Sequence, residues 1–413
     1  GIKPVYYAEI KEGLVFGSEI KGMIDKVPGS RTIDKLAMSC LAWTGINATR
    51  NTTFSGIKKL LAGETKIYNI ENKKFTKTKR VFIKPTSDHR FCPVEFKKMA
   101  KKTVEMCSIG QRKIGVFLSG GLDSSLIAHE LNLLKGPAVT FTNKMKPNIV
   151  TSEDFNSDAD AAEHLARVEG YKHTVVKVTP ENVVDSWNNS IYYMEQPIYS
   201  PSLAMYCYTN KVLHDNGIVV TMAGDMGDEI LGGYPKYWKL KKLNLKSWAA
   251  VVDKWTHRIK RPITASGINL IFDNNALREE LLKCYPDDLW NPEDPVASYM
   301  ALDCVTQVPE EFFNRNDKYG MAYGMEGRFP LATKMFMQYC MNIHSTFKIG
   351  SAKGDTKMLS KIAYKKELPR RIIRKMKTGW TVPLQQWWQK TGKADIPAMI
   401  VKDWKKIYQV TEY

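Results

Sequence analysis

Two short segments of the chain combine glycine, hydroxyl and carboxylate side chains in patterns that suit phosphate chemistry. The first is residues 119–125, Ser-Gly-Gly-Leu-Asp-Ser-Ser, which lies between an apolar run at 114–118 and a helix-like apolar pattern at 126–134. Glycines let a backbone come close to phosphate oxygens, and the unpaired N–H groups at the start of a helix attract anions. A strand, a glycine-rich turn and a helix start therefore predict an anion cradle, with the three serines as added donors.

Asp123 is an unexpected residue in a loop that holds anions. A carboxylate repels phosphate unless a cation lies between them, so we interpret Asp123 as a ligand of Mg²⁺. The segment has no Gly-Lys-Ser/Thr, so it is not a Walker loop. The alternative interpretation is a glycine turn that only joins a strand to a helix.

The second segment is residues 223–234, Ala-Gly-Asp-Met-Gly-Asp-Glu-Ile-Leu-Gly-Gly-Tyr. It follows an apolar run at 218–222, so Asp225, Asp228 and Glu229 stand at the carboxyl end of a predicted strand. Open α/β sheets bind their ligands at this end, and carboxylates beside a triphosphate are best explained by Mg²⁺. A solvated acidic turn with a helix cap is the alternative.

The surrounding elements must bring these two segments together. Runs typical of strands recur at 114–118, 138–142, 173–178 and 218–222, with helical patterns such as 159–168 between them. Strands that alternate with helices predict a parallel α/β sheet, and the chain after 234 reads as mostly helical. Residues 1–82 instead show short strand-like runs around a helical stretch near 33–43. A polar stretch at 82–91 predicts a linker, so we expect domains at 1–82 and 92–413.

Composition sets limits on the class of protein. With 43% hydrophobic and 25% charged residues, and no apolar run of about 18 residues, the sequence is typical of a globular protein outside the membrane. Seven scattered cysteines and seven scattered histidines favour a reducing, cytoplasmic setting and no structural metal.

The chain begins at Gly1, which suggests truncation or processing. A formal charge of +18 attracts polyanions, either nucleic acid or nucleotide phosphates, and charge alone does not separate the two.

The motifs carry a family resemblance. Residues 119–125 resemble the PP-loop of ATP pyrophosphatases, and residues 223–234 resemble the Ser-Gly-Glu-Gly-x-Asp-Glu-x-x-x-Gly-Gly-Tyr of asparagine synthetases and β-lactam synthetase. The resemblance implies that Asp123 and Asp228 bind Mg²⁺ and that Asp225, in place of a glutamate, positions or deprotonates the incoming amine. The positions it implies for ATP or pyrophosphate contact are Leu118, Ser119, Gly120, Gly121, Asp123, Ser124, Ser125, Thr142, Asn143, Ala223 and Gly224.

Two further stretches resemble the same family. Residues 314–318 and 325–330 resemble the stretch with its Glu-x-Arg-x-Pro signature, and we expect Glu326 and Arg328 to form a buried pair that organises the floor of the active site. Residues 377–384 resemble Lys-x-Gly-Phe-x-Val-Pro-Leu, which implies that Lys377 is catalytic and reaches the α-phosphate. The other basic residues of the run from Lys357, including Lys375, are expected to be solvated surface.

The front of the chain resembles the latter half of the family's glutaminase domain, at residues 1–8, 18–21 and 53–64. That domain uses an N-terminal cysteine as its nucleophile, and here position 1 is glycine. The missing half is either lost, cleaved or disordered, or a separate glutaminase polypeptide supplies it.

The resemblance implies an amide-forming ligase of asparagine biosynthesis with a PP-loop α/β domain, a helical C-terminal elaboration and a partial glutaminase-like β-rich domain before it. Mg²⁺ and ATP would adenylate a small carboxylate substrate, aspartate first, and ammonia or another amine would displace AMP. Asp225, Ala223 and Thr333 depart from the family pattern, which weakens the assignment of aspartate. A tRNA-modifying PP-loop enzyme and a non-catalytic nucleotide-binding relative are the alternatives. We expect no membrane and no nucleic-acid partner, and a homodimer is left open.

Overall fold

A parallel sheet lies at the centre of the larger part of the chain. The computed structural model describes residues 1–147, 154–200, 202–258, 274–352, 354–376, 382–388 and 395–411. The sheet strands are β6 (Ile114–Phe117), β7 (Val139–Met145), β8 (Lys172–Val178), β9 (Val220–Met222) and β10 (Glu326–Arg328). All neighbours run parallel in the order β10-β9-β6-β7-β8. The predicted parallel α/β architecture is confirmed, with β10 as a strand that the sequence pattern did not predict.

The strand order reverses direction between β6 and β9. From β6 the chain proceeds to β7 and β8 on one side, and it then returns to place β9 on the other side of β6. At such a point the loops that follow the two strands leave the sheet in different directions and open a crevice. The phosphate loop follows β6 and the acidic loop follows β9, so the topology itself brings the two sequence motifs to one place.

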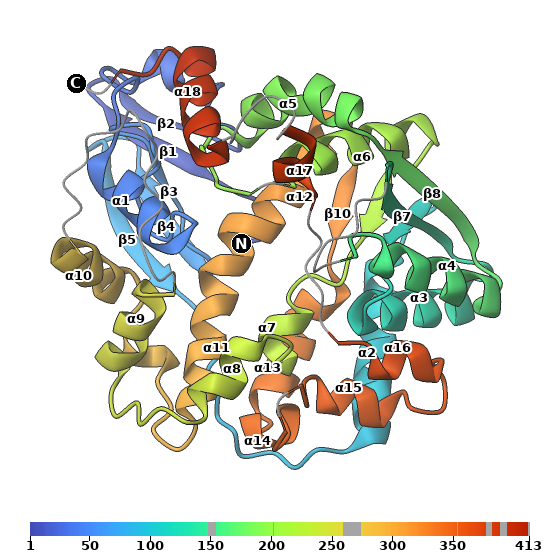
Figure 1. Cartoon of the computed structure of the whole chain (residues 1–413). Helices are drawn as coiled ribbons and strands as arrows, with labels where there is room; N and C mark the ends of the chain where they lie inside the picture. The colour runs from blue at the N-terminus through green and yellow to red at the C-terminus, as the bar shows by residue number, and fades with distance from the viewer. Residues whose placement is uncertain are drawn as a thin grey trace.

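Helices cover this sheet and fix the ends of its strands. In Figure 1, α3 (Leu122–Lys135) and α4 (Ser157–Glu169) lie beside the green and cyan strands, and they pack on β6, β7 and β8. The other helices of this region are α2 (Pro93–Cys107), α5 (Pro180–Met194) and α6 (Leu203–Asp215). Thr179 forms a capping box with Asn182 at the start of α5, which satisfies two backbone donors at that helix end.

The rest of the described chain after β9 is mostly helical, as predicted. Its helices are α7 (Gly227–Leu231), α8 (Pro235–Leu240), α9 (Trp248–Thr256), α10 (Asn274–Cys284), α11 (Pro295–Val305), α12 (Asn314–Ala322), α13 (Lys334–Met341), α14 (Ser345–Lys348), α15 (Met358–Ala363), α16 (Arg370–Arg374), α17 (Leu384–Trp388) and α18 (Ile396–Tyr408). Short 3₁₀ turns occur at η2 (Asp287–Leu289) and η4 (Pro330–Ala332), and a π-helical segment, η3 (Val308–Phe313), leads directly into α12.

The first 80 residues form a separate β-rich layer. The antiparallel strands β1 (Tyr6–Ile10), β2 (Gly13–Gly17) and β3 (Lys58–Lys59) pair in the order β2-β1-β3, and β4 (Glu64–Asn69) pairs with β5 (Lys74–Arg80). The 3₁₀ turn η1 (Ile24–Lys26) and helix α1 (Lys35–Thr44) complete the layer. The short strand-like runs and the helical stretch near 33–43 predicted for this part are confirmed.

The last described helix packs against this N-terminal layer. Figure 1 shows α18, in red, beside the blue elements of the N-terminal part. The Phe54 ring makes edge contacts with Trp404 and Tyr408 at centroid distances of 5.2 and 5.4 Å, and Thr32 forms a β-bridge with Thr411. The C-terminal helix therefore stabilises the N-terminal layer, although the two are far apart in sequence.

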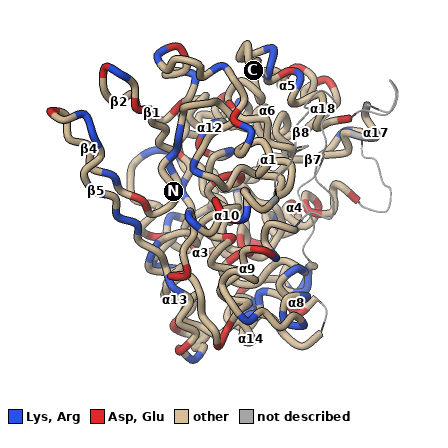
Figure 2. The backbone as a smooth tube through the Cα atoms, turned by 90° about the vertical axis from the view of Figure 1, so that its left-hand side faces the viewer, with Lys and Arg blue, Asp and Glu red and all other residues tan. Residues whose placement is uncertain are grey.

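Basic residues are spread over the whole molecule. Figure 2 shows Lys and Arg on many elements, including the β4–β5 hairpin, with Asp and Glu between them. The high net charge is thus carried by several parts of the molecule and is not confined to one element. Among the described helices, none combines the length and apolar character that crossing a membrane would require.

Candidate active site

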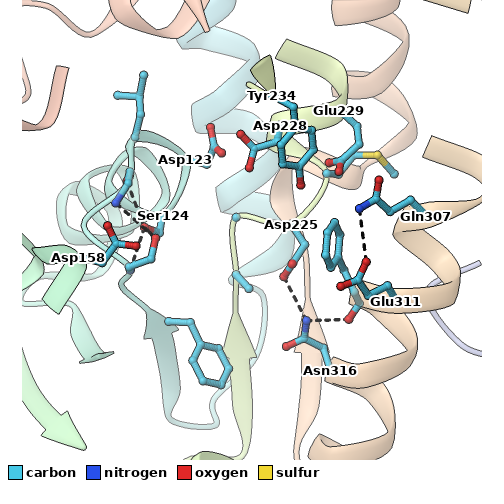
Figure 3. A pocket seen from close by; sticks show the side chains of 18 of the residues that line it. Asp123, Ser124, Asp158, Asp225, Asp228, Glu229, Tyr234, Gln307, Glu311 and Asn316 are labelled. Carbon is cyan, nitrogen blue, oxygen red and sulfur yellow. Dashed lines mark hydrogen bonds between the residues drawn. The ribbon is translucent and has the colours of Figure 1, made fainter. Parts of the chain in front are cut away.

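A cavity of about 440 Å³ opens at the crevice between the two motif loops (Figure 3). Its walls come from the phosphate loop, the acidic loop, the start of α6, the segment from η3 to α12, and residues near α15 and α16. The lining includes Ser119, Gly121, Asp123, Ser124, Ala223, Gly224, Asp225, Asp228, Glu229, Gln307, Glu311, Arg315, Asn316, Lys357, Lys361 and Lys375. Side chains from both sequence motifs therefore share one cavity.

The phosphate loop is tightly constrained by its neighbours. Gly120 has a φ of +67°, and a Cβ there would lie 2.5 Å from the carbonyl oxygen of Asp158 at the start of α4. Only glycine tolerates both the left-handed backbone and this close approach. The Ser119 backbone N–H donates to Ser124 Oγ at 3.1 Å, while Ser125 Oγ donates to the Gly121 carbonyl at 2.7 Å. Ser119, Gly121 and Ser124 line the cavity. Gly120 packs against α4 and Ser125 bonds to the loop backbone, so these two residues hold the loop in place.

The Asp123 and Asp228 side chains lie close together in the lining of the cavity (Figure 3). The Nζ atom of Lys357 lies between them, 2.5 Å from Asp123 Oδ2 and 2.6 Å from Asp228 Oδ1. Lys357 is only 7% exposed. The expectation that this lysine belongs to the solvated surface is therefore wrong, because its ammonium contacts two carboxylates that are themselves nearly buried.

The residues around this pair fit a magnesium ion. A cation, the Lys357 ammonium, already binds both carboxylates, and glycines leave the room that the carboxylates need. A Cβ at Gly233 would lie 1.8 Å from Asp228 Oδ1, and one at Gly227 would lie 2.5 Å from Asp123 Cγ. Mg²⁺ typically takes one or two protein carboxylates and completes its shell with phosphate oxygens and water. Within the described part of the chain, no group of three or more His, Cys, Asp or Glu is arranged to hold a metal ion.

Glu229 lies next to the aspartate pair but in a different environment. Its side chain is fully buried, and burial, reinforced by the neighbouring Asp228 carboxylate, raises the pKa of Glu229 well above that of an ordinary glutamate. Burial also raises the pKa of Tyr234, whose ring lies close to Glu229 in Figure 3. The two carboxylates of this loop cluster that contact a cation are those of Asp123 and Asp228.

Charged and amide side chains from η3 and α12 form the opposite wall. Asn316 Nδ2 donates to Asp225 Oδ2 at 3.1 Å, and Gln307 Nε2 donates to Glu311 Oε2 at 3.4 Å (Figure 3). The Arg315 guanidinium is stacked 3.8 Å above the Tyr206 ring and is 6% exposed. The sequence motifs placed Asp225 in the site. Arg315 and Asn316 belong to the stretch 314–318 that resembles the family but were given no individual role, and Gln307 and Glu311 were not identified.

The candidates for the adenine side lie behind the cavity wall. Leu118, Thr142 and Asn143 are all buried, and none of them is among the lining residues of the described chain. The Leu118 backbone N–H donates to the Phe141 carbonyl, and Asn143 Oδ1 accepts from Thr209. Phe117, one residue before Leu118, lines the cavity instead. Contact of these three residues with adenine stays a prediction.

Glu326 and Arg328 form the predicted ion pair, with Arg328 Nε 3.1 Å from Glu326 Oε1. The expectation that the pair is buried at the floor of the active site is wrong. The Glu326 side chain is 50% exposed, and both residues line a second cavity of about 450 Å³. The reason is that they stand on β10, the edge strand of the sheet, where Arg328 reaches the carbonyls of Cys107 and Ile109.

Lys375 is also placed differently from the expectation of a solvated surface. Its Nζ lies 2.7 Å from Asp158 Oδ1, its side chain is 15% exposed, and it lines the main cavity. Asp158 belongs to the start of α4, which packs against Gly120 of the phosphate loop, so Lys375 ties its segment to that loop. Lys377 lies outside the described residues.

Comparison with known proteins gives the family. The family model for asparagine synthase matches residues 95–406, and the model for a glutamine amidotransferase domain matches residues 1–81. The chain belongs to the asparagine synthase family.

Curated relatives agree with this assignment at low identity. Asparagine synthetase [glutamine-hydrolyzing] 1 of Bacillus subtilis is 23% identical, over 94% of this chain and 65% of its own length. Asparagine synthetase [glutamine-hydrolyzing] 3 of the same organism is 24% identical, over 83% and 58%. The chain thus spans less than two thirds of these relatives.

Among solved structures, U34-tRNA thiolase NcsA from Methanococcus maripaludis with its [4Fe-4S] cluster aligns at a TM-score of 0.32 and 12% identity. The alignment covers 80% of this chain and 86% of that one. NMN synthetase from Francisella tularensis aligns at 0.26 and 13%, over 64% and 98%.

Proposed function

We propose that this protein is an ATP-dependent amide ligase that activates a carboxylate as its acyl-adenylate and releases pyrophosphate. The observation that carries the proposal is the placement of Asp123 and Asp228 on either side of one cation, directly beside a glycine-rich phosphate loop. This arrangement suits a nucleotide polyphosphate with Mg²⁺. Membership of the asparagine synthase family supports the same reaction class.

In the proposed reaction the substrate carboxylate attacks the α-phosphorus of ATP, and pyrophosphate leaves. An amine then attacks the acyl carbon, loses a proton, and AMP leaves. The phosphate loop holds the departing pyrophosphate through Ser119, Ser124 and the backbone at the start of α3. Asp123 and Asp228 would hold Mg²⁺, which supplies positive charge beside the β- and γ-phosphates when it is bound. Lys377, assigned from the family resemblance alone, would stabilise charge at the α-phosphate.

The wall formed by η3 and α12 suits the acceptor and the amine. Arg315 offers a buried cation to a carboxylate, while Asp225 and Glu311 offer acceptors to an ammonium group. Asp225 is held by Asn316 and is the residue proposed to orient the amine and take its proton. An acceptor with both charges, such as aspartate, fits this wall.

The N-terminal layer suggests where the nitrogen would come from. Residues 1–81 match a glutamine amidotransferase domain, and the relatives carry the name glutamine-hydrolyzing. We propose that residues 1–82 are part of such a domain and that residues 92–413 form the synthetase. Ammonia, free or released from glutamine by a glutaminase, would then be the amine.

Product analysis by ³¹P NMR tests the reaction class. With Mg²⁺, ATP, aspartate and ammonium, the phosphorus products should be AMP and pyrophosphate, because the loop lacks the lysine of a Walker motif. The signal should disappear when the carboxylate is omitted and when Asp228 is replaced by asparagine. Formation of ADP and orthophosphate would contradict the proposal.

A further inference from the structure

The position of the Lys357 ammonium raises the question of when a divalent cation can enter the site. Nζ lies 2.5 and 2.6 Å from the two carboxylate oxygens that would bind the metal. An ion placed between Asp123 and Asp228 would compete with this ammonium for the same oxygens. The lysine and the metal therefore cannot both keep these contacts.

Features of the fold show that the lysine is held there. Lys357 has a φ of +56°, a left-handed backbone that is uncommon for a residue with a side chain. Its side chain passes directly over Gly233, where a Cβ would lie 2.5 Å from Lys357 Cε. The close approach of the Lys357 side chain to Gly233 and the left-handed backbone of Lys357 both direct its ammonium to the aspartate pair.

We propose that Lys357 is an internal counter-ion that keeps divalent cations out of the Asp123–Asp228 pair until a polyphosphate enters the cavity. Without nucleotide, the lysine leaves the pair with a single net negative charge, and a dication would have to displace a buried ammonium. With a polyphosphate in the cavity, new anionic oxygens are available to the lysine, and the dication can take the carboxylates. Metal and nucleotide would consequently bind together.

The inference depends on the proposed function only in its choice of a polyphosphate as the ligand that releases Lys357. Exclusion of the metal from the nucleotide-free protein follows from the contacts alone. The two ideas can therefore be tested apart, because metal binding without nucleotide needs no turnover.

Electron paramagnetic resonance of free Mn²⁺ measures that binding. The wild-type protein should bind Mn²⁺ weakly without nucleotide. Lys357→Met should bind it at least about tenfold more tightly, since a unit charge within about 4 Å matters strongly in a partly buried site. Adding Asp228→Asn to Lys357→Met should abolish the gain, and Lys357→Arg, which keeps the charge, should stay close to wild type.

Lys361→Met is the matched control. Lys361 lies one helical turn further along α15 and also lines the cavity. Its replacement by methionine therefore also removes one positive charge from the lining of this cavity. No ion pair with either aspartate is found for Lys361 in the described chain. This variant should therefore bind Mn²⁺ nearly as wild type does.

Two results would overturn the inference. The first is tight one-to-one Mn²⁺ binding by the wild-type protein without nucleotide, which needs no variant and so does not depend on how well a variant folds. The second is an equal gain for Lys357→Met and Lys361→Met, which would indicate a general effect of charge. Binding of α,β-methylene-ATP, measured separately, tests the proposed function.

Discussion

At the scale of the residue, lysines of one basic segment have very different surroundings. Lys357 lies buried between two aspartates, and Lys375 pairs with Asp158 in the cavity wall. Lys365 and Lys366 are exposed. These differences arise from how α15 and α16 pack. A count of positive charges in the sequence therefore does not show which lysines contact the acidic residues of the cavity.

The first prediction at this scale concerns Lys377. Replacing it with alanine should lower turnover by about 10²–10³-fold with little change in ATP affinity, because a fixed cation acts most strongly on charge that develops in the transition state. Turnover and nucleotide affinity would be measured together. Lys366→Ala is the surface control and should be nearly silent, whereas Lys375 is unsuitable because of its ion pair with Asp158. Similar behaviour of Lys377→Ala and Lys366→Ala would remove the catalytic role.

At the scale of the element, the loops after β6 and β9 approach each other through glycines. Gly233→Ala should cut activity by about 10²-fold, the size of effect expected when a group near the reaction moves by about 1 Å, because the new methyl group would displace the Asp228 carboxylate. The apparent Mg²⁺ requirement should rise in the same assay. Gly22→Ala is the control, since its Cβ would meet no atom closer than 3.7 Å. Normal activity of Gly233→Ala would show that Asp228 does not need its present position.

The elements also show what the sequence could predict. The strands β6 to β9 and the helices between them have apolar patterns of their own, and the two motif loops follow strands, so both the sheet and the meeting of the loops were predictable. The strand β10 has only the residues Glu-Gly-Arg, and pairing with β9 holds it in place. The wall from Gln307 to Asn316 was predictable only in part. The stretch 314–318 resembles the family, but Gln307 and Glu311 join it through the packing of η3 and α12, which no sequence pattern indicates.

At the scale of the whole molecule, buried charged side chains contact both the N-terminal layer and the rest of the chain. Lys318 on α12 pairs with Glu195, which also accepts from the Lys21 backbone N–H at 2.8 Å. The Lys318 ammonium lies 4.7 Å from the centre of the Tyr6 ring on β1. Lys59 pairs with Glu310 across the same boundary. With these contacts and the packing of α18, we expect residues from both parts to unfold together.

The last prediction tests that coupling. Lys318→Met leaves Glu195 as a buried carboxylate without its cation, and Glu195→Gln leaves Lys318 without its anion, so each should lower the free energy of unfolding by about 3–5 kcal/mol. The double variant removes both charges and should lose clearly less than the sum of the two, because neither partner is then left alone.

Denaturant unfolding, followed by tryptophan fluorescence and by circular dichroism, would give the free energy of unfolding of the wild type and the three variants, with one shared transition expected for both signals. Lys211→Met serves as the control, since its pair with Asp215 is more than half exposed and should contribute less than about 1 kcal/mol. Strict additivity would contradict a direct interaction between Lys318 and Glu195. A separate early transition of the N-terminal layer in the wild-type protein would show that the two parts do not unfold together.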